Sequence, residues 1–403
     1  MSPLPAAASP AAAAGARPPA PGARAAGDPK GGRLPIVDLV RLVSILAVFA
    51  PHLSVGLRPA SPFFDDLWSH WAGNGSYGVT LFFVISGLVI TRTILSRTPY
   101  LEAIDLRGFY LRRAGRILPL LVLVIAAGAV AMRLAPPSPA RDWCLKNPSA
   151  RFDAGFWAAL ATFSFNWLRI RREASAFGFG LQWDVLWSLA IEEQFYFCYP
   201  LLVRRLGTRR SLAFALAPVV AFGPLSRAVA MAVNPESFLL AFTNSFAAFE
   251  QLAMGALLAL WLEREEAAPA RAGRPWPGRL AGWGAAAGVA FVYWYSDLGK
   301  APDRIWGPSA IAGCLTVFLA VGIRRGWFAW RWSRGLTWLG QLSYGGYLLH
   351  PLAIFALWPL LEPRSRWVGF PLVAATTLGA AALLHRFYEV PANRAIRRFW
   401  AAQ

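Results

Sequence analysis

The chain has 403 residues, of which 56% are hydrophobic and 15% are charged, and its net charge is +19. About a quarter of the residues in a soluble globular protein are charged, so this composition excludes an ordinary water-soluble domain and requires apolar surface that faces lipid. The Lys and Arg residues lie in short clusters between apolar runs, which is the pattern of loops beside anionic lipid and excludes a nucleic-acid-binding face.

The segment before the first apolar run, residues 1–33, is rich in Ala, Pro, Gly and Arg and is predicted to be a disordered cytoplasmic tail. It carries no apolar stretch with a cleavage site, so we do not interpret it as a signal peptide. The apolar runs that follow predict an all-α fold, a polytopic bundle of about ten transmembrane helices. These predicted spans are 36–57, 77–95, 114–134, 183–203, 211–231, 243–262, 279–296, 307–323, 336–359 and 367–386.

A shorter apolar piece, residues 155–168, is too brief to cross a bilayer alone and is predicted to be re-entrant or interfacial. With the N-terminus in the cytoplasm, about 26 Lys and Arg lie inside and about 13 outside. This count predicts a multi-pass protein with both termini in the cytoplasm, including a C-terminal tail at 396–403. Three basic residues oppose that arrangement, because they fall on the outer side: Arg169, Arg171 and Arg172.

The first span contains three ionisable residues, Asp38, Arg41 and His52. Such groups are expensive inside a membrane and are therefore candidates for a functional site. Arg41 and His52 are eleven residues apart, so they share one helix face with an axial separation of about 16 Å. Simpler alternatives are open: Asp38 can pair with Arg41 or Arg33, Arg41 can reach the headgroups, and His52 can be a hydrogen-bonded packing residue. Pro51 weakens the helix beside His52.

Two further clusters of charge follow in the third and fourth spans. Arg113 and Arg116 are three residues apart at the start of a helix, which suits either a phosphate clamp or ordinary positive anchors. Residues 183–200 contain Asp184, Glu192 and Glu193 in an otherwise apolar and aromatic segment. The two glutamates point about 100° apart, so they cannot face one cavity equally, and at least one is expected to meet a buried Arg or His.

The ninth span carries Gly345 and Gly346, which permit close approach of another helix. Its last polar residue, His350, is either a second functional histidine or a buried hydrogen-bonding one. The three cysteines of the chain are widely spaced and indicate neither a disulfide framework nor a metal site. The polar residues of this span are Gln341, Ser343, Tyr344 and His350.

Taken together and in this order, six segments resemble the acyltransferase 3 family of membrane O-acyltransferases, over residues 34–395. They are VRLVSILAVFAPH (40–52), GVTLFFVISGLVIT (78–91), FYLRRAGRILP (109–119), WSLAIEEQFYFCYPLL (187–202), LSYGGYLLHP (342–351) and YEVPANR (388–394). The family pattern implies an Arg and a His in the first span, which Arg41 and His52 match. It also implies the pair Arg113 and Arg116, and an acid in a WSL-x-x-E segment at Glu192.

Two features depart from that pattern. Pro51 stands where such proteins more often carry an aromatic residue, which puts the helix geometry beside His52 in question. The chain also ends shortly after the last predicted span, at residue 403. We therefore expect it to lack the attached extracytoplasmic esterase-like domain that some family members carry.

The resemblance implies an O-acyltransferase of the bacterial inner membrane, most simply an O-acetyltransferase. The donor would be cytoplasmic acyl-CoA, and no bound cofactor or metal is expected. The acceptor would be a hydroxyl of a carbohydrate, a lipid-linked glycan or a small glycosylated molecule. The rival interpretation is a transporter or flippase, but the two halves of the chain show no convincing repeat of the kind many transporters have.

The resemblance also implies a role for individual residues in the transfer of the acyl group from donor to acceptor. Arg113, Arg116 and Arg41 would hold acyl-CoA, and His52 would act as general base or carry the acyl group itself. Arg41 can alternatively stabilise the thioester oxyanion, and Glu192 would orient the histidine or bind a sugar hydroxyl. The residues expected to contact substrate are Trp187, Tyr196, Tyr344 and His350.

Overall fold

The computed structural model describes residues 34–53, 61–98, 100–146, 152–172, 183–266, 278–330 and 333–401. The predicted disordered tail and the side chain of Asp184 lie outside this part. Within it, every regular element is helical. The helices are α1 (Pro35–His52), α2 (Pro62–Gly73), α3 (Tyr77–Arg97), η1 (Leu101–Ala103), α4 (Leu106–Leu134), α5 (Pro139–Lys146), α6 (Ala154–Ala161), α7 (Phe165–Arg171), η3 (Trp183–Val185), α8 (Leu186–Leu206), α9 (Arg209–Val233), α10 (Phe238–Thr243), α11 (Ser245–Glu266), α12 (Arg279–Tyr295), α13 (Ala301–Arg324), α14 (Arg334–Gln341), α15 (Ser343–Leu361), α16 (Arg366–Leu384), a π-helical turn η6 (His385–Glu389) and α17 (Val390–Ala401).

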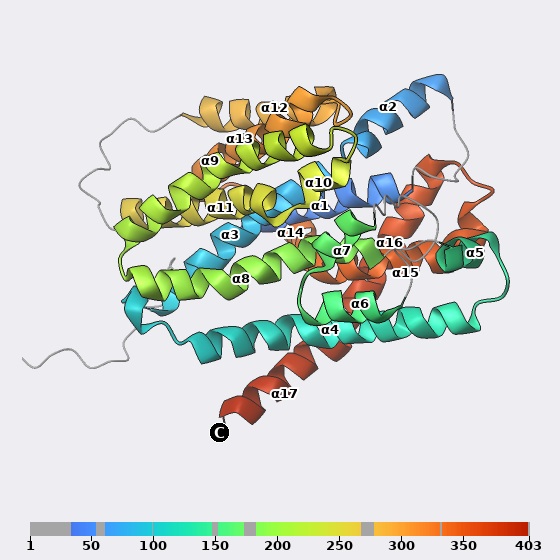
Figure 1. Ribbon diagram of the computed structural model, residues 1–403, viewed down its shortest axis with the longest axis horizontal. Coiled ribbons are helices and arrows are strands. Elements are labelled where there is room, and N and C mark those ends of the chain that lie inside the picture. The colour runs from blue at the N-terminus through green and yellow to red at the C-terminus, as the bar shows by residue number, and fades with distance from the viewer. Residues whose placement is uncertain are drawn as a thin grey trace, which may run out of the picture. The chain divides into compact units, whose positions relative to one another are not determined.

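The long helices lie roughly side by side, with α3 and α11 in the middle, α9, α12 and α13 on one side, and α8 and α4 on the other (Figure 1). Eight described helical segments are long and apolar enough to cross a membrane, by length and composition alone. Two predicted spans are outside that set: α8, whose hydropathy is lowered by Glu192, Glu193 and Gln194, and α12, which has only 17 residues. Both pack along apolar neighbours, so the predicted polytopic bundle is confirmed.

Three local features differ from the sequence prediction or refine it. The span predicted at 336–359 is two helices, α14 and α15, which meet at Leu342. Just before the break, α14 lies so close to α1 that a Cβ added to Gly340 would sit 1.8 Å from the carbonyl oxygen of Asp38. The amphipathic helix α2 was not predicted. Residues 155–168 form α6 and α7, whose lengths of about 12 and 10 Å are too short to cross a bilayer.

Helix α3 is held against α11 by two glycines. A Cβ on Gly87 would lie 1.9 Å from the carbonyl oxygen of Leu252, and one on Gly255 would lie 2.0 Å from that of Val84. Only glycine allows the two backbones to approach this closely, as is common between membrane helices. The contact fixes α3 next to the candidate site, because Ser86, the residue before Gly87, lies in that site.

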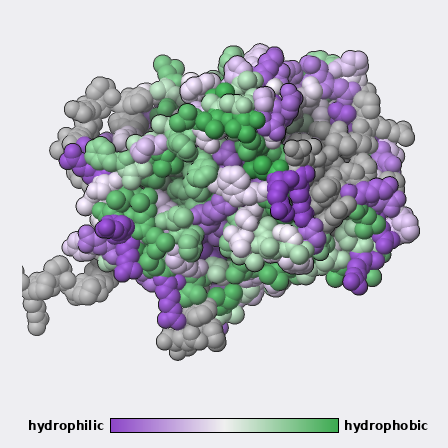
Figure 2. Space-filling model, in the orientation of Figure 1, coloured by the Kyte–Doolittle hydropathy of each residue, from purple (hydrophilic) through white to green (hydrophobic). Residues whose placement is uncertain are grey.

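Large apolar side chains remain exposed on the outer faces of the bundle. Phe214 and Phe222 of α9 and Phe197 of α8 are examples. Figure 2 shows hydrophobic side chains over much of one face, with hydrophilic ones more frequent toward the helix ends. Exposed apolar surface flanked by polar ends is the arrangement expected of helices that face lipid.

Candidate active site

Helix α1 carries the first charged groups of the site. Asp38 is 3% exposed and accepts a hydrogen bond from Nη1 of Arg41 over 3.1 Å. Arg41 nevertheless keeps contact with an internal cavity of about 110 Å³, which we call the arginine cavity. The expected Asp38–Arg41 pair therefore forms, and it holds the Arg41 guanidinium at the cavity wall instead of removing it from the site.

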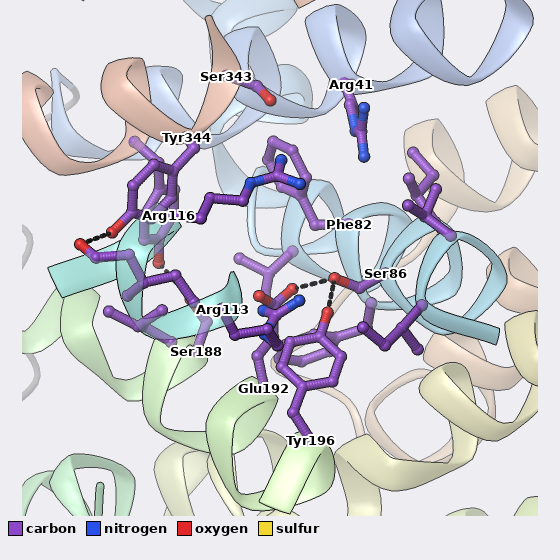
Figure 3. A pocket seen from close by; sticks show the side chains of 18 of the residues that line it. Arg41, Phe82, Ser86, Arg113, Arg116, Ser188, Glu192, Tyr196, Ser343 and Tyr344 are labelled. Atoms are coloured by element: carbon purple, nitrogen blue, oxygen red, sulfur yellow. Dashed lines mark hydrogen bonds between the residues drawn. The ribbon is translucent and has the colours of Figure 1, made fainter. Parts of the chain in front are cut away.

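The arginine cavity lies among α1, α3, α4, α8 and α15 (Figure 3). Three arginines from two of these helices line it: Arg41 of α1, and Arg113 and Arg116 of α4. Arg113 and Arg116, which the sequence predicts as a pair, thus lie at one cavity together with Arg41 of the first span. A cavity with three guanidinium groups at its wall is suited to an anionic ligand such as a phosphate.

Arg113 is firmly held by the protein. Its Nη2 donates to Glu193 over 3.1 Å, and its guanidinium carbon lies 3.4 Å from the centre of the Tyr196 ring. Arg116 is different, because within the described part of the chain it makes no hydrogen bond or ion pair. Its side chain reaches into the cavity between Phe82 and Tyr344 (Figure 3). Arg116 therefore has guanidinium donors to offer to a ligand.

The two adjacent glutamates of α8 have separate roles, as their 100° offset predicts. Glu193 pairs with Arg113, whereas Glu192 lines the arginine cavity. The hydroxyl of Ser86 donates to Oε1 of Glu192 over 2.6 Å and lies 2.5 Å from the Tyr196 hydroxyl. Glu192 lines the arginine cavity together with Arg113 and Arg116, and it is not among the described residues that line the cavity of His52.

His52 lines a second, smaller cavity of about 30 Å³, which we call the histidine cavity. Helix α1 remains helical through Pro51 to His52, so the departure from the family pattern at Pro51 leaves the histidine on the helix. Trp187 lines this cavity, as expected of a substrate-contacting residue. Val79 and Tyr347 line both cavities, which makes the two spaces neighbours along α1.

Tyr347, at the boundary of the two cavities, is fixed by its hydroxyl. That hydroxyl donates to the carbonyl oxygen of Val185 over 2.8 Å and accepts from Ser188, also over 2.8 Å. Tyr344 and Tyr196 both line the arginine cavity. The Tyr344 hydroxyl donates to the carbonyl of Ile117 over 2.8 Å, so it also joins α15 to α4.

His350 lines neither cavity. It is completely buried, and its ring lies edge-on to that of His52 with the centroids 4.8 Å apart. Nδ1 is 2.7 Å from the carbonyl oxygen of Tyr347, which can only accept, so Nδ1 carries the hydrogen. Nε2 has no hydrogen-bond partner in the described part of the chain. His350 thus packs against the ring of His52, and it is not among the described residues that line either cavity.

Ser86, Tyr347 and Arg169 are among the residues of the two cavities that were not predicted from the sequence. Ser86 and Tyr347 carried no signal, because single hydroxyl groups are common in apolar helices. Arg169 did carry one, since its position opposed the positive-inside rule. It is 6% exposed and lines the histidine cavity.

Comparison with known proteins gives consistent results. Residues 34–386 match the family model described as an acyltransferase domain. The peptidoglycan O-acetyltransferase OatA of Listeria monocytogenes is 29% identical over 378 residues, which cover 90% of this chain and 56% of that protein. The Bacillus subtilis protein named putative peptidoglycan O-acetyltransferase YrhL is 31% identical over 206 residues, covering 50% of this chain and 28% of its own. The chain spans about half or less of these curated relatives. No match was found among solved structures.

Proposed function

The chain belongs to the acyltransferase family whose model matches residues 34–386, and on that premise we propose that it is a membrane O-acetyltransferase. The acyl donor in this proposal is acyl-CoA from the cytoplasm. The acceptor is a glycan hydroxyl on the other side of the membrane, in keeping with the relatives named as peptidoglycan O-acetyltransferases.

One observation carries the proposal: the arginine cavity and the histidine cavity adjoin each other along α1, with Val79 and Tyr347 common to both. Arg41 lines the first and His52 the second, and the helix separates them by about 16 Å along its axis. A ligand with an anionic head and a long narrow arm suits this arrangement. Acyl-CoA has that form, with phosphates at one end and a thioester at the end of its pantetheine arm.

The arginine cavity would hold the phosphates of the donor. Arg116 offers unused donors, while Arg113 and Arg41 are fixed by Glu193 and Asp38 and add positive charge. Guanidinium groups bind phosphate through paired N–H donors, so three of them give both affinity and orientation. The arm would then extend past Val79 and Tyr347 toward His52.

At the histidine cavity, His52 would act as the general base. It would take the proton of the acceptor hydroxyl as the hydroxyl oxygen attacks the thioester carbonyl, and would return the proton to the departing CoA thiolate. A histidine suits both steps because its ordinary pKa lies near neutrality. Trp187 offers an aromatic ring in the same cavity, against which a sugar can pack.

The proposal is tested by measuring CoA release from acetyl-CoA by the full chain in nanodiscs, with peptidoglycan fragments and other glycans as acceptors. We expect acceptor-dependent release by the wild type and a loss of about 10²–10⁴-fold in kcat for His52→Ala. His70→Ala is the matched control, because His70 is half-exposed on α2 and lines neither cavity. Equal rates for wild type and His52→Ala would refute the role of His52. Absence of both acetyl-CoA binding and CoA release would refute the donor.

A further inference from the structure

The run of basic residues that opposes the positive-inside rule separates into two kinds in the structure. Nη2 of Arg172 donates to both carboxylate oxygens of Asp153 over 2.7 Å, and Arg171 is exposed. Arg169 is instead buried and lines the histidine cavity with His52 and Trp187. Arg169 is therefore the member of this run that a ligand in the histidine cavity can contact.

Helix α7, which carries Arg169, is locked to its neighbours one turn earlier, at Asn166. The completely buried Asn166 side chain donates to the Thr243 carbonyl over 3.2 Å and to the Ser245 hydroxyl over 3.0 Å. It accepts from Nε2 of Gln194 over 3.0 Å. These hydrogen bonds form a clamp that joins α7 to α8 and to the start of α11. The clamp holds the backbone of α7 just before Arg169.

The turn that leads into α7 is also under strain. Phe163, between α6 and α7, has a φ of 50°, which is unusual for a residue other than glycine. Gln194 donates to the Phe163 carbonyl over 2.6 Å and so holds the turn. Strained residues of this kind persist where the surrounding structure over-determines them, often next to functional sites. The turn, the clamp and the short helix together present one side chain, Arg169, to the cavity.

The described wall of the histidine cavity carries one permanently charged side chain. Among the described residues that line it, Arg169 is the only permanently charged one, and none is acidic. The Arg169 guanidinium lies 5.7 Å from the centre of the Trp187 ring, within the range of a cation–π contact. A fixed positive charge in a small apolar cavity favours any step in which negative charge develops there.

We propose that Arg169 is a further catalytic residue, which stabilises the oxyanion formed during acyl transfer; this rests on the proposed function above. As the acceptor oxygen bonds to the thioester carbon, His52 takes the hydroxyl proton and the C=O π electrons move onto the carbonyl oxygen. Arg169 pairs with that negative oxygen. When the C=O bond reforms, the C–S bond breaks, the thiolate takes the proton from His52, and Arg169 is left unchanged.

Arg41 is the other candidate for stabilising the oxyanion, and the positions of the two arginines distinguish them. Arg41 lines the arginine cavity, is bound to Asp38, and lies about 16 Å along α1 from His52. Arg169 lines the cavity that contains His52. The reacting carbonyl therefore meets Arg169, and Arg41 acts on the donor's anionic end.

The test compares Arg169→Gln, Arg169→Lys and Arg169→Ala with the control Arg172→Gln, in the full chain in nanodiscs with acetyl-CoA and an acceptor that the wild type uses. We expect kcat of Arg169→Gln to fall about 10²–10³-fold, the usual effect of losing one oxyanion donor. The KM for acetyl-CoA and for the acceptor should change less than about threefold, because the oxyanion exists only in the transition state. Arg172→Gln should retain activity.

Two further readouts separate catalysis from a structural role. Arg169→Lys should recover part of the lost kcat, and added guanidinium salt should restore kcat of Arg169→Ala in a saturable way, with the unfolding temperature unchanged. A higher acceptor KM with unchanged kcat would overturn the assignment, as would a loss of kcat in Arg169→Ala that guanidinium cannot restore. If the wild type itself releases no CoA, the proposed function fails first, and the role of Arg169 fails with it.

Discussion

Two regions of the molecule bury arginine in different ways. Arg227 of α9 is 1% exposed, and all of its nitrogens are used: it donates to Glu250, to Ser309 and to the carbonyls of Ile305 and Ala247, over 2.6 to 3.2 Å. Arg116, in the arginine cavity, has no such partner in the described part of the chain. An ionisable residue inside a membrane span is a functional candidate by default, but only the incompletely satisfied one has donors left for a ligand.

The contrast between the two arginines would not hold if Arg227 were dispensable for the fold. Removing one partner of a buried pair leaves an uncompensated charge, so Arg227→Met should lower the free energy of unfolding by about 3–5 kcal/mol. Replacing both partners, as Arg227→Met with Glu250→Leu, should recover at least half of that loss. Unfolding in mixed micelles with increasing SDS measures both variants. Equal losses in the single and the double variant would show that the ion pair is not what the fold depends on.

The opposite behaviour is expected at Arg116. Arg116→Gln should leave the free energy of unfolding close to that of the wild type, because no hydrogen bond or ion pair to a described residue is lost. Its affinity for acetyl-CoA should fall about 10- to 150-fold, which corresponds to the 1.5–3 kcal/mol of a hydrogen bond to a charged group. Direct binding of radiolabelled acetyl-CoA checks this. The loss should be smaller for a ligand from which a phosphate has been removed, and an unchanged affinity would contradict the assignment of Arg116 to the donor.

His350 tests whether a buried nitrogen without a partner is enough to mark a ligand site. Its Nε2 has no partner in the described part of the chain, but the residue lines neither cavity. His350→Leu should change the free energy of unfolding little, because removal of the buried Nε2 without a partner offsets loss of the Nδ1 bond to the Tyr347 carbonyl. We expect kcat to fall about 3- to 10-fold as the His52 ring loses its edge-on neighbour, while the KM for acetyl-CoA stays unchanged. A large rise in the KM of either substrate would instead show that His350 contacts it.

The smallest effect is expected at a pair that faces water. The Asp153 carboxylate accepts from Arg172 and from the backbone N–H of Phe156, and these bonds lower the pKa of Asp153 below its ordinary value. The charged form is therefore favoured by the fold, so its stabilising effect is present above the ordinary pKa and is lost as the pH falls through the lowered one. Asp153→Ala should cost about 1 kcal/mol at pH 7, as expected for the loss of a helix cap, and progressively less below about pH 4. Thermal unfolding of both proteins across this range is the measurement, and a pH-independent difference would show that the carboxylate charge is not responsible.

Much of the bundle could be predicted from the sequence, because membrane spans are determined by local hydropathy. The break at Leu342 was not predicted, and beside it Gly340 approaches the Asp38 carbonyl, a contact between distant segments that local hydropathy does not report. Helix α2 was not predicted; its tertiary packing includes Trp68, which is buried against Trp367.

The candidate site was predictable where periodicity or adjacency constrains side-chain direction. The shared face of Arg41 and His52 and the opposed directions of Glu192 and Glu193 follow from helix geometry alone. The buried position of Arg169 does not, because it depends on the clamp at Asn166, which joins three helices. In the sequence Arg169 was visible only as a charge on the side of the membrane where few charges were expected.

The central claim is that the two cavities form one path, with the donor bound at one end and the acceptor at the other. The most direct test uses sealed proteoliposomes that enclose a peptidoglycan-type acceptor, with radiolabelled acetyl-CoA added only outside. The path predicts that labelled acetyl esters accumulate on the enclosed acceptor, and that vesicles containing His52→Ala remain unlabelled. Labelling only of an acceptor placed on the same side as acetyl-CoA would contradict it.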